Sequence, residues 1–300
     1  MSKHMIVLGG GESGVGAALL GNQLGYKVFV SDKGSIGTSF QKELDDHQIE
    51  WEQGQHTAAQ ILKADLVIKS PGISSDTPIV EALRSVEIPL LSEIEFASLH
   101  TDAVLIGITG TNGKTTTAML THHLLASAGK SVALAGNIGE SFAKAITIYS
   151  PDYWVLELSS FQLEDIISFH PRYAVMTSLT PDHLDRYNNS FDRYVDAKFC
   201  MLKNQKEEDY FIYDDTDYEI KLALERHKPK SQRIPYTDKK IKDKRFNSID
   251  MIRIDNPSLE GIHNSKNAMA AATIAQLVNI RKQTIRDSLQ TFKGAPHRLE

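Results

Sequence analysis

The residues of this sequence with the clearest chemical meaning lie at 107–117, which read Gly-Ile-Thr-Gly-Thr-Asn-Gly-Lys-Thr-Thr-Thr. They follow an apolar run at 103–108 and open a helical pattern. A strand, a glycine-rich turn and a helix N-terminus in that order aim backbone N–H groups, a lysine ammonium and a threonine hydroxyl at one polyphosphate. The pattern predicts an ATP-binding loop. The alternative is a glycine-rich turn whose lysine faces solvent.

The loop departs from the G-x-x-x-x-G-K-[ST] pattern, because Ile108 stands where the first glycine is usual. Gly110 and Gly113 must therefore supply the special backbone geometry. The residues predicted to hold ATP here are Gly110, Thr111, Asn112, Gly113, Lys114, Thr115 and Thr116.

A carboxylate is expected close to this loop. Residues 153–158, Tyr-Trp-Val-Leu-Glu-Leu, form a buried-strand pattern that brings Glu157 to the carboxyl end of a strand, beside Ser159 and Gln162. Ligands of open α/β sheets bind off the carboxyl ends of the strands. Mg²⁺ prefers hard oxygen ligands and keeps several waters. Glu157 is therefore a candidate magnesium ligand.

Two further residues have less certain meaning. The next strand is expected to end in residues 180–187, which brings His183 to the same edge, either as a structural histidine or as a contact to metal or phosphate. Lys198 lies at helical spacing from Tyr194 and Met201 and by spacing alone is an ordinary helix-surface lysine.

Asn264 and Asn267 stand three residues apart at the start of a helical pattern, so that both amides project to one side. Helix capping explains such residues, and so does recognition of a nucleobase edge. The spacing does not choose between these two interpretations.

A second glycine motif lies near the N-terminus. Residues 9–14 match G-x-G-x-x-G between a strand and a helix, and Asp32 ends the next strand, where an acidic group can meet a ribose hydroxyl. Alone, the motif would normally indicate NAD. A close-packed strand-to-helix turn without a ligand is the other interpretation.

The elements that position these residues predict an α/β protein. The sequence indicates a Rossmann-like parallel-sheet domain followed by a P-loop-type α/β ATPase domain, with a boundary near Glu93. The stretch 203–250 is polar and is expected to be solvated surface, with its densest basic patch at 239–245. The expected strands are 5–8, 27–31, 66–69, 88–91, 103–108, 131–135, 153–158 and 173–177, and the expected helices include 14–25 and 265–278.

Composition narrows the class of protein. With 300 residues, 41% hydrophobic and 24% charged, the chain can bury a large core. A formal net charge of −5 gives no support for nucleic-acid binding. The single cysteine, Cys200, excludes an intramolecular disulfide. No apolar run is long enough for a signal or membrane-spanning segment, so we expect no membrane insertion. The single cysteine fits a reducing cytoplasm, and the net charge favours small-molecule partners. We also expect a monomer.

Taken together, these segments resemble the Mur ligase superfamily, the ATP-dependent amide ligases of peptidoglycan precursor synthesis. The tract at 157–162 is most similar to the branch that adds D-glutamate to UDP-N-acetylmuramoyl-L-alanine, and Asn112 argues against the L-alanine-adding branch, which has His there. The segments that carry the resemblance are 110–116, 156–164, 182–185, Lys198, 263–267, 70–73 and 297–298.

The resemblance implies a role for individual residues. Lys114 would contact the phosphates, and Thr115 with Glu157 would hold one Mg²⁺. His183 and Lys198 would serve a second Mg²⁺, for which Lys198 is carbamylated. The nucleotide contacts would come from Asn264, Asn267 and Arg298, and the substrate contacts from Ser13, Asp32, Ser70, Asn137, Ser159 and Gln162.

The family has a third domain after the His-Arg motif, which this sequence reaches only at residues 297–298. The resemblance therefore implies a UDP-sugar-binding domain at 1–93, an ATP-binding domain at 94–297, and the start of a third domain at 298–300. We expect such a form to be catalytically incomplete. The competing functions are another Mur-type ligase, an NAD-dependent oxidoreductase and a non-enzymatic nucleotide-binding scaffold.

Overall fold

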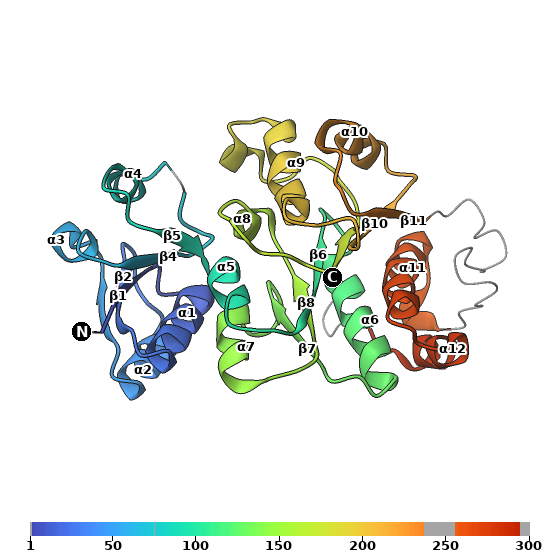
Figure 1. Cartoon of the computed structure of the whole chain (residues 1–300), viewed down its shortest axis with the longest axis horizontal. Helices are drawn as coiled ribbons and strands as arrows, with labels where there is room; N and C mark the ends of the chain where they lie inside the picture. Colours follow the sequence, from blue (N-terminus) through green and yellow to red (C-terminus); the bar gives the residue numbers. More distant parts are fainter. Residues whose placement is uncertain (1, 75, 237–255, 295–300) are drawn as a thin grey trace. The chain divides into compact units, whose positions relative to one another are not determined.

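The computed structural model describes residues 2–74, 76–236 and 256–294, and the chain forms two compact units (Figure 1). Both are built on an all-parallel sheet, which confirms the predicted α/β class. Unit 1 comprises Met1–Asp102, Gly139–Ser150 and Phe161–Phe169, and unit 2 comprises Ala103–Ile138, Pro151–Ser160 and His170–Glu300. The domain boundary near Glu93 stays a prediction.

Unit 1 has a five-stranded sheet in the order β3-β2-β1-β4-β5. Its central strands are buried almost throughout, as expected for a parallel sheet that is covered on both faces. The strand order reverses beside β1, so the turn after β1 lies at the point where such sheets bind ligands. The strands are β1 (His4–Leu8), β2 (Lys27–Asp32), β3 (Glu50–Gln53), β4 (Leu66–Lys69) and β5 (Leu90–Ser92).

The helices of unit 1 pack against this sheet and against one another. Helix α1 packs against α7, although many residues separate them in sequence. Gly16 makes this approach close, because a Cβ there would lie 2.0 Å from Ser141 Oγ. The helices are α1 (Glu12–Gln23), α2 (Thr38–Asp46), α3 (Ala58–Ile61), α4 (Pro78–Ser85), α5 (Glu93–Ser98) and α7 (Phe142–Ile148), while α8 (Ser160–Leu163) begins at the last residue of a unit 2 segment.

Unit 2 has a six-stranded sheet in the order β11-β10-β9-β6-β8-β7. Strand β6 lies between β8 and β9, so the order reverses around it and its carboxyl end becomes the expected ligand position. The strands are β6 (Val104–Thr109), β7 (Val132–Gly136), β8 (Tyr153–Glu157), β9 (Tyr173–Met176), β10 (Tyr210–Asp214) and β11 (Gln232–Tyr236).

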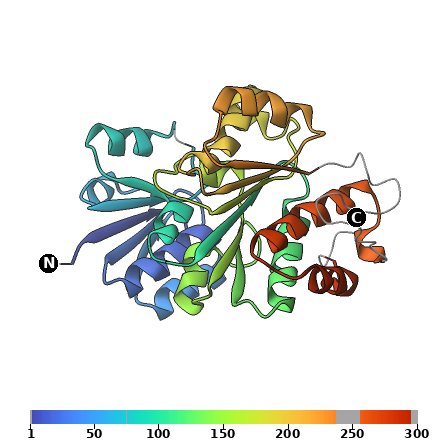
Figure 2. The same cartoon turned by 45° about the vertical axis from the view of Figure 1, so that its right-hand side comes forward.

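Helices cover both faces of the second sheet (Figure 2). One face buries Ile106 and Ile108 in a core shared with α6, α11 and α12. On the other face, Gly107 lies against Met201 of the short helix that follows α9. The helices are α6 (Lys114–Ser127), α9 (Phe191–Phe199), α10 (Tyr218–His227), α11 (Ile262–Leu277) and α12 (Lys282–Thr291), with 3-10 turns at η1 (Leu184–Tyr187), η2 (Cys200–Leu202) and η4 (Pro257–Leu259).

Several predicted elements need correction. The strand expected at 88–91 is β5, which starts two residues later because Glu87 has φ 56° and ends the preceding turn. The polar stretch expected to be solvated surface contains β10 and β11. Strand β3 was not predicted, because it is a charged edge strand. The basic patch at 239–245 lies outside the described residues.

Other expectations hold with small shifts. Helix α1 begins at Glu12 rather than residue 14, and α11 begins at Ile262 rather than 265. No helix among the described residues is long and apolar enough to cross a membrane. Cys200, the single cysteine of the sequence, forms no intramolecular disulfide.

One buried acid stands out in unit 1. Glu93, at the start of α5, is 1% exposed, and its Oε1 accepts a 2.5 Å hydrogen bond from the Ala143 N–H at the start of α7. Its Oε2 is buried and has no hydrogen-bond partner among the described residues. Burial raises the pKa of Glu93 to about 7, opposed by the Ala143 N–H and reinforced by the charge of Glu12. The ionised carboxylate is therefore a cost to folding at neutral pH.

We predict that Glu93→Gln stabilises the protein at pH 8 by about 1–3 kcal/mol. The folded state binds the proton more tightly than the unfolded state, so the benefit should shrink as pH falls through 7 and vanish below 4.5, where both states become protonated. Urea unfolding at pH 5 and pH 8 measures this. The exposed Glu225→Gln serves as control, and an equal effect of Glu93→Gln at both pH values would contradict the prediction.

Candidate active site

The glycine-rich loop of unit 2 joins β6 to α6 at the carboxyl end of the sheet. The Thr111 N–H donates to the Ser178 carbonyl at 2.8 Å, and Thr177 Oγ1 donates to the Asn112 carbonyl at 2.6 Å. The loop is thus held by the segment that follows β9, and its shape depends on two neighbouring strands.

Glycine is required at both loop positions that the spacing singled out. Gly110 has φ +143° and Gly113 has φ +86°. A Cβ at Gly110 would lie 2.0 Å from Thr177 Oγ1, and one at Gly113 would lie 2.3 Å from Asn267 Oδ1. Backbone conformation and close approach therefore both exclude larger residues.

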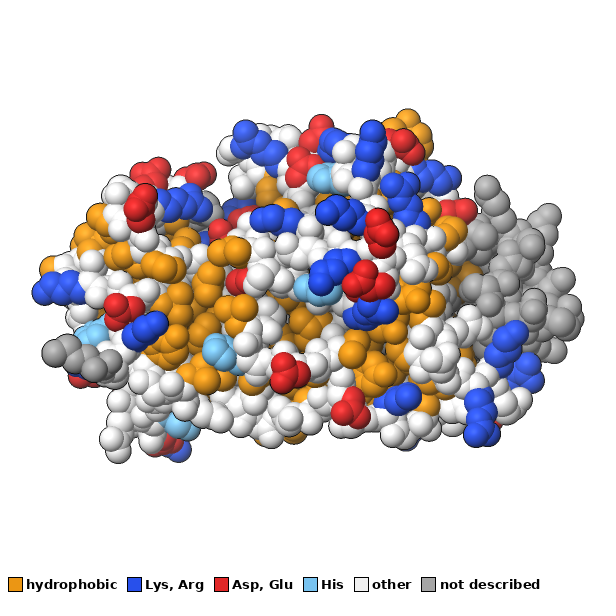
Figure 3. Space-filling model, viewed as in Figure 1, with side chains coloured by type: hydrophobic (Ala, Val, Ile, Leu, Met, Phe, Trp, Pro, Cys, Tyr) orange, Lys and Arg blue, Asp and Glu red, His pale blue; other side chains and the backbone are white. Residues whose placement is uncertain are grey.

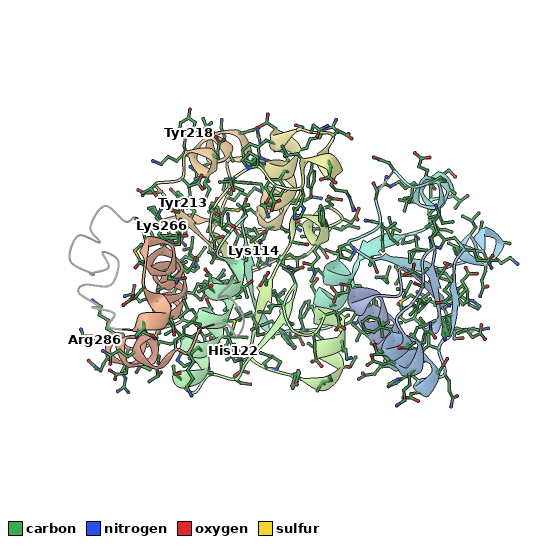
Figure 4. All side chains as sticks on the ribbon, turned by 180° about the vertical axis from the view of Figure 1, so that it is seen from behind. Lys114, His122, Tyr213, Tyr218, Lys266 and Arg286 are labelled. Atoms are coloured by element: carbon green, nitrogen blue, oxygen red, sulfur yellow. The ribbon has the colours of Figure 1, made fainter. Side chains whose placement is uncertain are left out.

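Lys114, labelled in Figure 4, is the first residue of α6. Its ammonium folds back over the loop. Its Nζ donates to the Thr111 carbonyl at 2.8 Å and to the Gly110 carbonyl at 3.1 Å. The lysine thus lies where the loop and the helix N-terminus together favour an anion. Thr115 and Thr116 follow it in the first turn.

Lys198 is not the surface lysine that its spacing suggested. It is 2% exposed, and its Nζ donates to the Gly110 carbonyl at 2.8 Å. The same Nζ lies 4.6 Å from the centre of the Tyr194 ring, whose hydroxyl is 3.0 Å from Thr111 Oγ1. Tertiary packing of α9 against the loop explains this burial, and helical spacing alone carries no such information.

The surroundings of Lys198 favour its neutral form. Burial, together with the positive charge of Lys114, lowers the pKa of Lys198 to about 7, while the charge of Asp182 acts in the opposite direction. Two lysines therefore contact one loop, and the amine of Lys198 loses its proton near neutral pH, far more readily than an exposed lysine does.

Glu157 is the last residue of β8, as predicted, and pairs in register with Ile108 of β6. Its Oε1 accepts a 3.1 Å hydrogen bond from Asn137 Nδ2. Its Oε2 is buried and has no hydrogen-bond partner among the described residues. A buried carboxylate oxygen without a donor suits a hard cation, so the residues present fit Mg²⁺.

His183 lies further from the sheet than expected. Strand β9 ends at Met176, so residues 180–187 form a separate loop and 3-10 turn instead of the strand end. The His183 side chain is 57% exposed, and its Nε2 lies 3.6 Å from Asp182 Oδ2. Within the described ranges, no three His, Cys, Asp or Glu side chains gather into a metal-binding group.

A cavity of about 1130 Å³ lies in unit 2 beside the glycine-rich loop. Its wall combines the loop, the ends of β9 and β10, and the first turns of α11. Its lining includes Asn112, Gly113, Thr116, Asp214, Thr216, Asp217, His263, Asn264, Lys266 and Asn267.

Both predicted asparagines line this cavity, and neither accepts a capping hydrogen bond. The N-cap of α11 is Gly261, which has no side-chain cap. Asn264 Nδ2 donates to the Glu260 carbonyl at 3.1 Å, and Asn267 Oδ1 accepts from Thr117 Oγ1 at 3.3 Å. The capping interpretation is therefore wrong for both residues.

The sequence analysis missed an ion pair in the same cavity. Lys266 Nζ lies 2.7 Å from Asp214 Oδ2 and donates to Thr216 Oγ1 at 2.8 Å. Asp214 ends β10, the strand hidden in the polar stretch. Had the apolar residues at 211–212 indicated that strand, the rule that located Glu157 would have located Asp214 as well.

In unit 1, the first glycine motif forms the turn between β1 and α1. Asp32 accepts from the Gly10 N–H at 2.6 Å through Oδ2 and from the Gly34 N–H at 2.7 Å through Oδ1. Both oxygens thus bind the protein's own backbone. This carboxylate therefore stabilises the turn, whereas the sequence predicted only a contact with a ribose hydroxyl.

Ser70 and Ser13 lie near that turn. Ser70 Oγ is buried without a hydrogen-bond partner among the described residues, and a Cβ at Gly9 or Gly14 would lie 2.7 or 3.0 Å from it. Ser13 is in the first turn of α1. The turn therefore collects hydroxyl groups and a helix N-terminus, which together suit a phosphate.

The remaining predicted residues are distributed as follows. Ser159 lies two residues after Glu157, in unit 2, and Gln162 is 3% exposed in unit 1. Arg298 lies outside the described residues.

Charges of both signs alternate over α9 and α10 (Figure 3). The Arg226 guanidinium lies 2.7 Å from Asp192 Oδ1 through Nη1 and 2.6 Å from Asp196 Oδ1 through Nη2. Asp196 Oδ1 also lies within hydrogen-bond distance of His227 Nε2. Because these pairs are largely exposed, this is a solvated surface of mixed charge.

Two protein-family models match this chain. The family description "Mur ligase middle domain" matches residues 108–275, and "MurD N-terminal domain" matches residues 5–79. The chain belongs to the Mur ligase family. The resemblance inferred from the motifs is therefore confirmed, and the NAD-dependent oxidoreductase loses its basis.

Curated Mur ligases match along the whole chain. A UDP-N-acetylmuramoylalanine–D-glutamate ligase from Christiangramia forsetii is 46% identical over 312 residues, covering 100% of this chain and 70% of the relative. The enzyme of the same name from Bacteroides fragilis is 44% identical, covering 99% and 70%.

Solved Mur ligase structures share the fold. A UDP-N-acetylmuramate:L-alanyl-gamma-D-glutamyl-meso-diaminopimelate ligase from Neisseria meningitides aligns with a TM-score of 0.68 at 19% identity, covering 99% of this chain and 100% of that one. A UDP-N-acetylmuramate-alanine ligase from Thermotoga maritima aligns with a TM-score of 0.61 at 21% identity, covering 98% and 69%.

We predict that Gly113→Ala abolishes nucleotide binding and destabilises unit 2 by more than the 1–2 kcal/mol or so that a left-handed residue costs. The added Cβ would meet Asn267 Oδ1 at 2.3 Å. Gly129→Ala is the matched control, because Gly129 has φ +74° and nothing within 4 Å of its Cβ position. Titration with a fluorescent ATP analogue and urea unfolding compare the two. Equal losses in both variants would mean that backbone strain alone matters.

Proposed function

We propose that this protein uses ATP to join D-glutamate to UDP-N-acetylmuramoyl-L-alanine in peptidoglycan precursor synthesis. Mur ligases are ATP-dependent, ADP-forming amide ligases that use Mg²⁺, and curated relatives at 43–46% identity add D-glutamate. The observation that carries the proposal is the convergence of the Lys114 loop, the unpaired Glu157 oxygen and the buried Lys198 in one unit.

The chemistry requires activation of a carboxylate. A carboxylate is a poor electrophile, so phosphoryl transfer from ATP supplies a leaving group as an acyl phosphate. The amine of D-glutamate then attacks through a tetrahedral intermediate, and phosphate leaves. Lys114 offsets the negative charge that builds up on the transferred group, and the loop N–H groups orient it.

We assign the metal-binding role to Thr115 and Glu157 for one Mg²⁺, and to His183 and Lys198 for a second. Bound Mg²⁺ neutralises charge on the phosphate oxygens during transfer. The buried, unpaired Oε2 of Glu157 supports the first assignment. Asn137 supports it too, because its amide orients the other carboxylate oxygen.

We infer that Lys198 is carbamylated. An ammonium would repel Mg²⁺, whereas reaction of the neutral amine with CO₂ yields an anionic oxygen ligand. The burial of Lys198 and its nearness to the charge of Lys114 support the neutral amine that this reaction requires.

The remaining assignments follow the two units. Residues 94–297 would bind ATP, with nucleoside contacts from Asn264, Asn267 and Arg298. Residues 1–93 would bind the uridine diphosphate through Ser13, Asp32 and Ser70. The rest of the substrate would meet Asn137, Ser159 and Gln162. Because these substrates are cytoplasmic metabolites, we infer a cytoplasmic enzyme. We also propose that it acts as a monomer.

The direct test is phosphate release by the protein with the full length of its relatives. We expect release only when ATP, UDP-N-acetylmuramoyl-L-alanine and D-glutamate are all present. Replacement of D-glutamate by L-alanine or diaminopimelate should give none. Turnover with one of those amino acids instead would identify a different Mur-type ligase.

A variant pair tests the metal-binding carboxylate in the same assay. Glu157→Gln keeps the shape but removes the charge of a direct ligand, so the Mg²⁺ concentration for half-maximal rate should rise by at least the roughly 10-fold that loss of an outer-shell partner costs. The exposed Glu225→Gln should leave it unchanged. An unaltered Mg²⁺ requirement in Glu157→Gln would remove Glu157 from the site.

Carbamylation has its own test. With ¹³C-bicarbonate, we expect a carbamate carbon signal in the wild type that rises between pH 6 and 8, because the amine loses its proton around a pKa of about 7. Lys198→Met should lack the signal, and the exposed Lys221→Met should keep it. An identical signal in Lys198→Met would refute the modification at this residue.

A further inference from the structure

Lys69, the last residue of β4, is a buried cation in unit 1 with no role assigned so far. Its side chain is 1% exposed, and its Nζ lies 2.9 Å from Asp165 Oδ2. The same Nζ donates to the Ile73 carbonyl at 2.8 Å. A single ammonium thus joins the end of β4, the turn at 70–73 and the segment that contains Asp165.

The turn held by Lys69 carries Ser70. The Ser70 N–H donates to the Leu8 carbonyl at 3.0 Å, and the Ile73 N–H donates to the Ser70 carbonyl at 3.0 Å. These bonds hold Ser70 Oγ against Gly9 and Gly14 of the first glycine turn. The turn therefore presents one hydroxyl where a diphosphate would lie.

Asp165 is itself on an anchored segment. Glu95 Oε2 accepts from the Ile167 N–H at 3.0 Å and the Phe169 N–H at 2.8 Å, while Oε1 accepts from the Ser168 N–H at 2.8 Å. Three backbone donors on one carboxylate fix this segment. Lys69 therefore has a fixed partner.

The energetics indicate a geometric role. Removing two charges from water costs much of what their attraction returns, so a buried ion pair is weak evidence for a gain in stability. Lys69 is also too buried, and too fully neutralised by Asp165, to contact a phosphate itself. What the pair does provide is a defined position for the turn at 70–73.

We propose that the Lys69–Asp165 ion pair positions the Ser70 turn to receive the diphosphate of a uridine nucleotide. Lys69 is a positioning residue that acts through Ser70. The proposal rests on the proposed function, from which it takes the nucleotide.

The test uses UDP as probe, in calorimetric titrations of the wild type, Lys69→Met and the double variant Lys69→Met/Asp165→Leu. We expect the affinity for UDP to fall at least about tenfold in both variants, because a misplaced contact group loses most of its interaction. The affinity for an ATP analogue should change less than about twofold, because that cavity lies in unit 2.

The double variant separates positioning from stability, since it leaves no unpaired charge. We expect it to unfold at a temperature close to that of the wild type while still binding UDP weakly. Lys144→Met is the matched control, because it breaks a 2.7 Å pair with Glu43 on partly exposed helices of the same unit. It should bind UDP normally.

The outcomes are distinct. Wild-type affinity for UDP in the double variant would overturn the positioning role and leave the proposed function intact. A wild type that binds the ATP analogue but not UDP would overturn the sugar-nucleotide site and this inference with it. Equal weakening by Lys144→Met would assign the effect to general destabilisation of unit 1.

Discussion

A lysine ammonium removed from water must find an acceptor, and Lys198 finds the carbonyl of Gly110. Gly110 has φ +143°, a conformation that side chains rarely adopt, and a Cβ there would lie 2.0 Å from Thr177 Oγ1, so only glycine can hold this carbonyl in place. Helix α9, the loop after β6 and the segment after β9 therefore depend on one another. The same contact sets Lys198 close to Lys114, and burial together with that neighbouring charge lowers the pKa of Lys198 to about 7.

Both units have the same sheet topology around their glycine turns, with different residues at the strand ends. In each, the first strand lies inside the sheet and a glycine turn follows it where the strand order reverses. In unit 2, the neighbouring strand ends in the carboxylate of Glu157, which suits a metal ion. In unit 1, the neighbouring strand β4 is followed by the hydroxyl of Ser70, which suits a phosphate. One architecture thus accommodates two chemistries through the residues at its strand ends.

The sequence predicted those parts of the fold in which local pattern and burial agree. The apolar strands of both sheets and the loop at Lys114 belong to this class, because a parallel strand buried on both faces reads as an apolar run. The edge strands β3 and β11 were not predicted, because the solvent on one side of an edge strand permits polar residues and so hides the apolar pattern. The burial of Lys198 also escaped, because its acceptor lies 88 residues away in sequence. Asp214 was missed with the strand that carries it.

The order of segments along the chain matters for how this protein is assembled. Helix α7, which covers α1, is encoded after the glycine-rich loop of unit 2, and the segment anchored by Glu95 comes later still. On a ribosome, the first hundred residues would emerge with α1 uncovered and Glu93 still in water. Unit 1 therefore completes its packing only after two segments of unit 2, Ala103–Ile138 and Pro151–Ser160, have been synthesised. Although each unit has its own sheet, synthesis of unit 1 ends only after synthesis of unit 2 has begun.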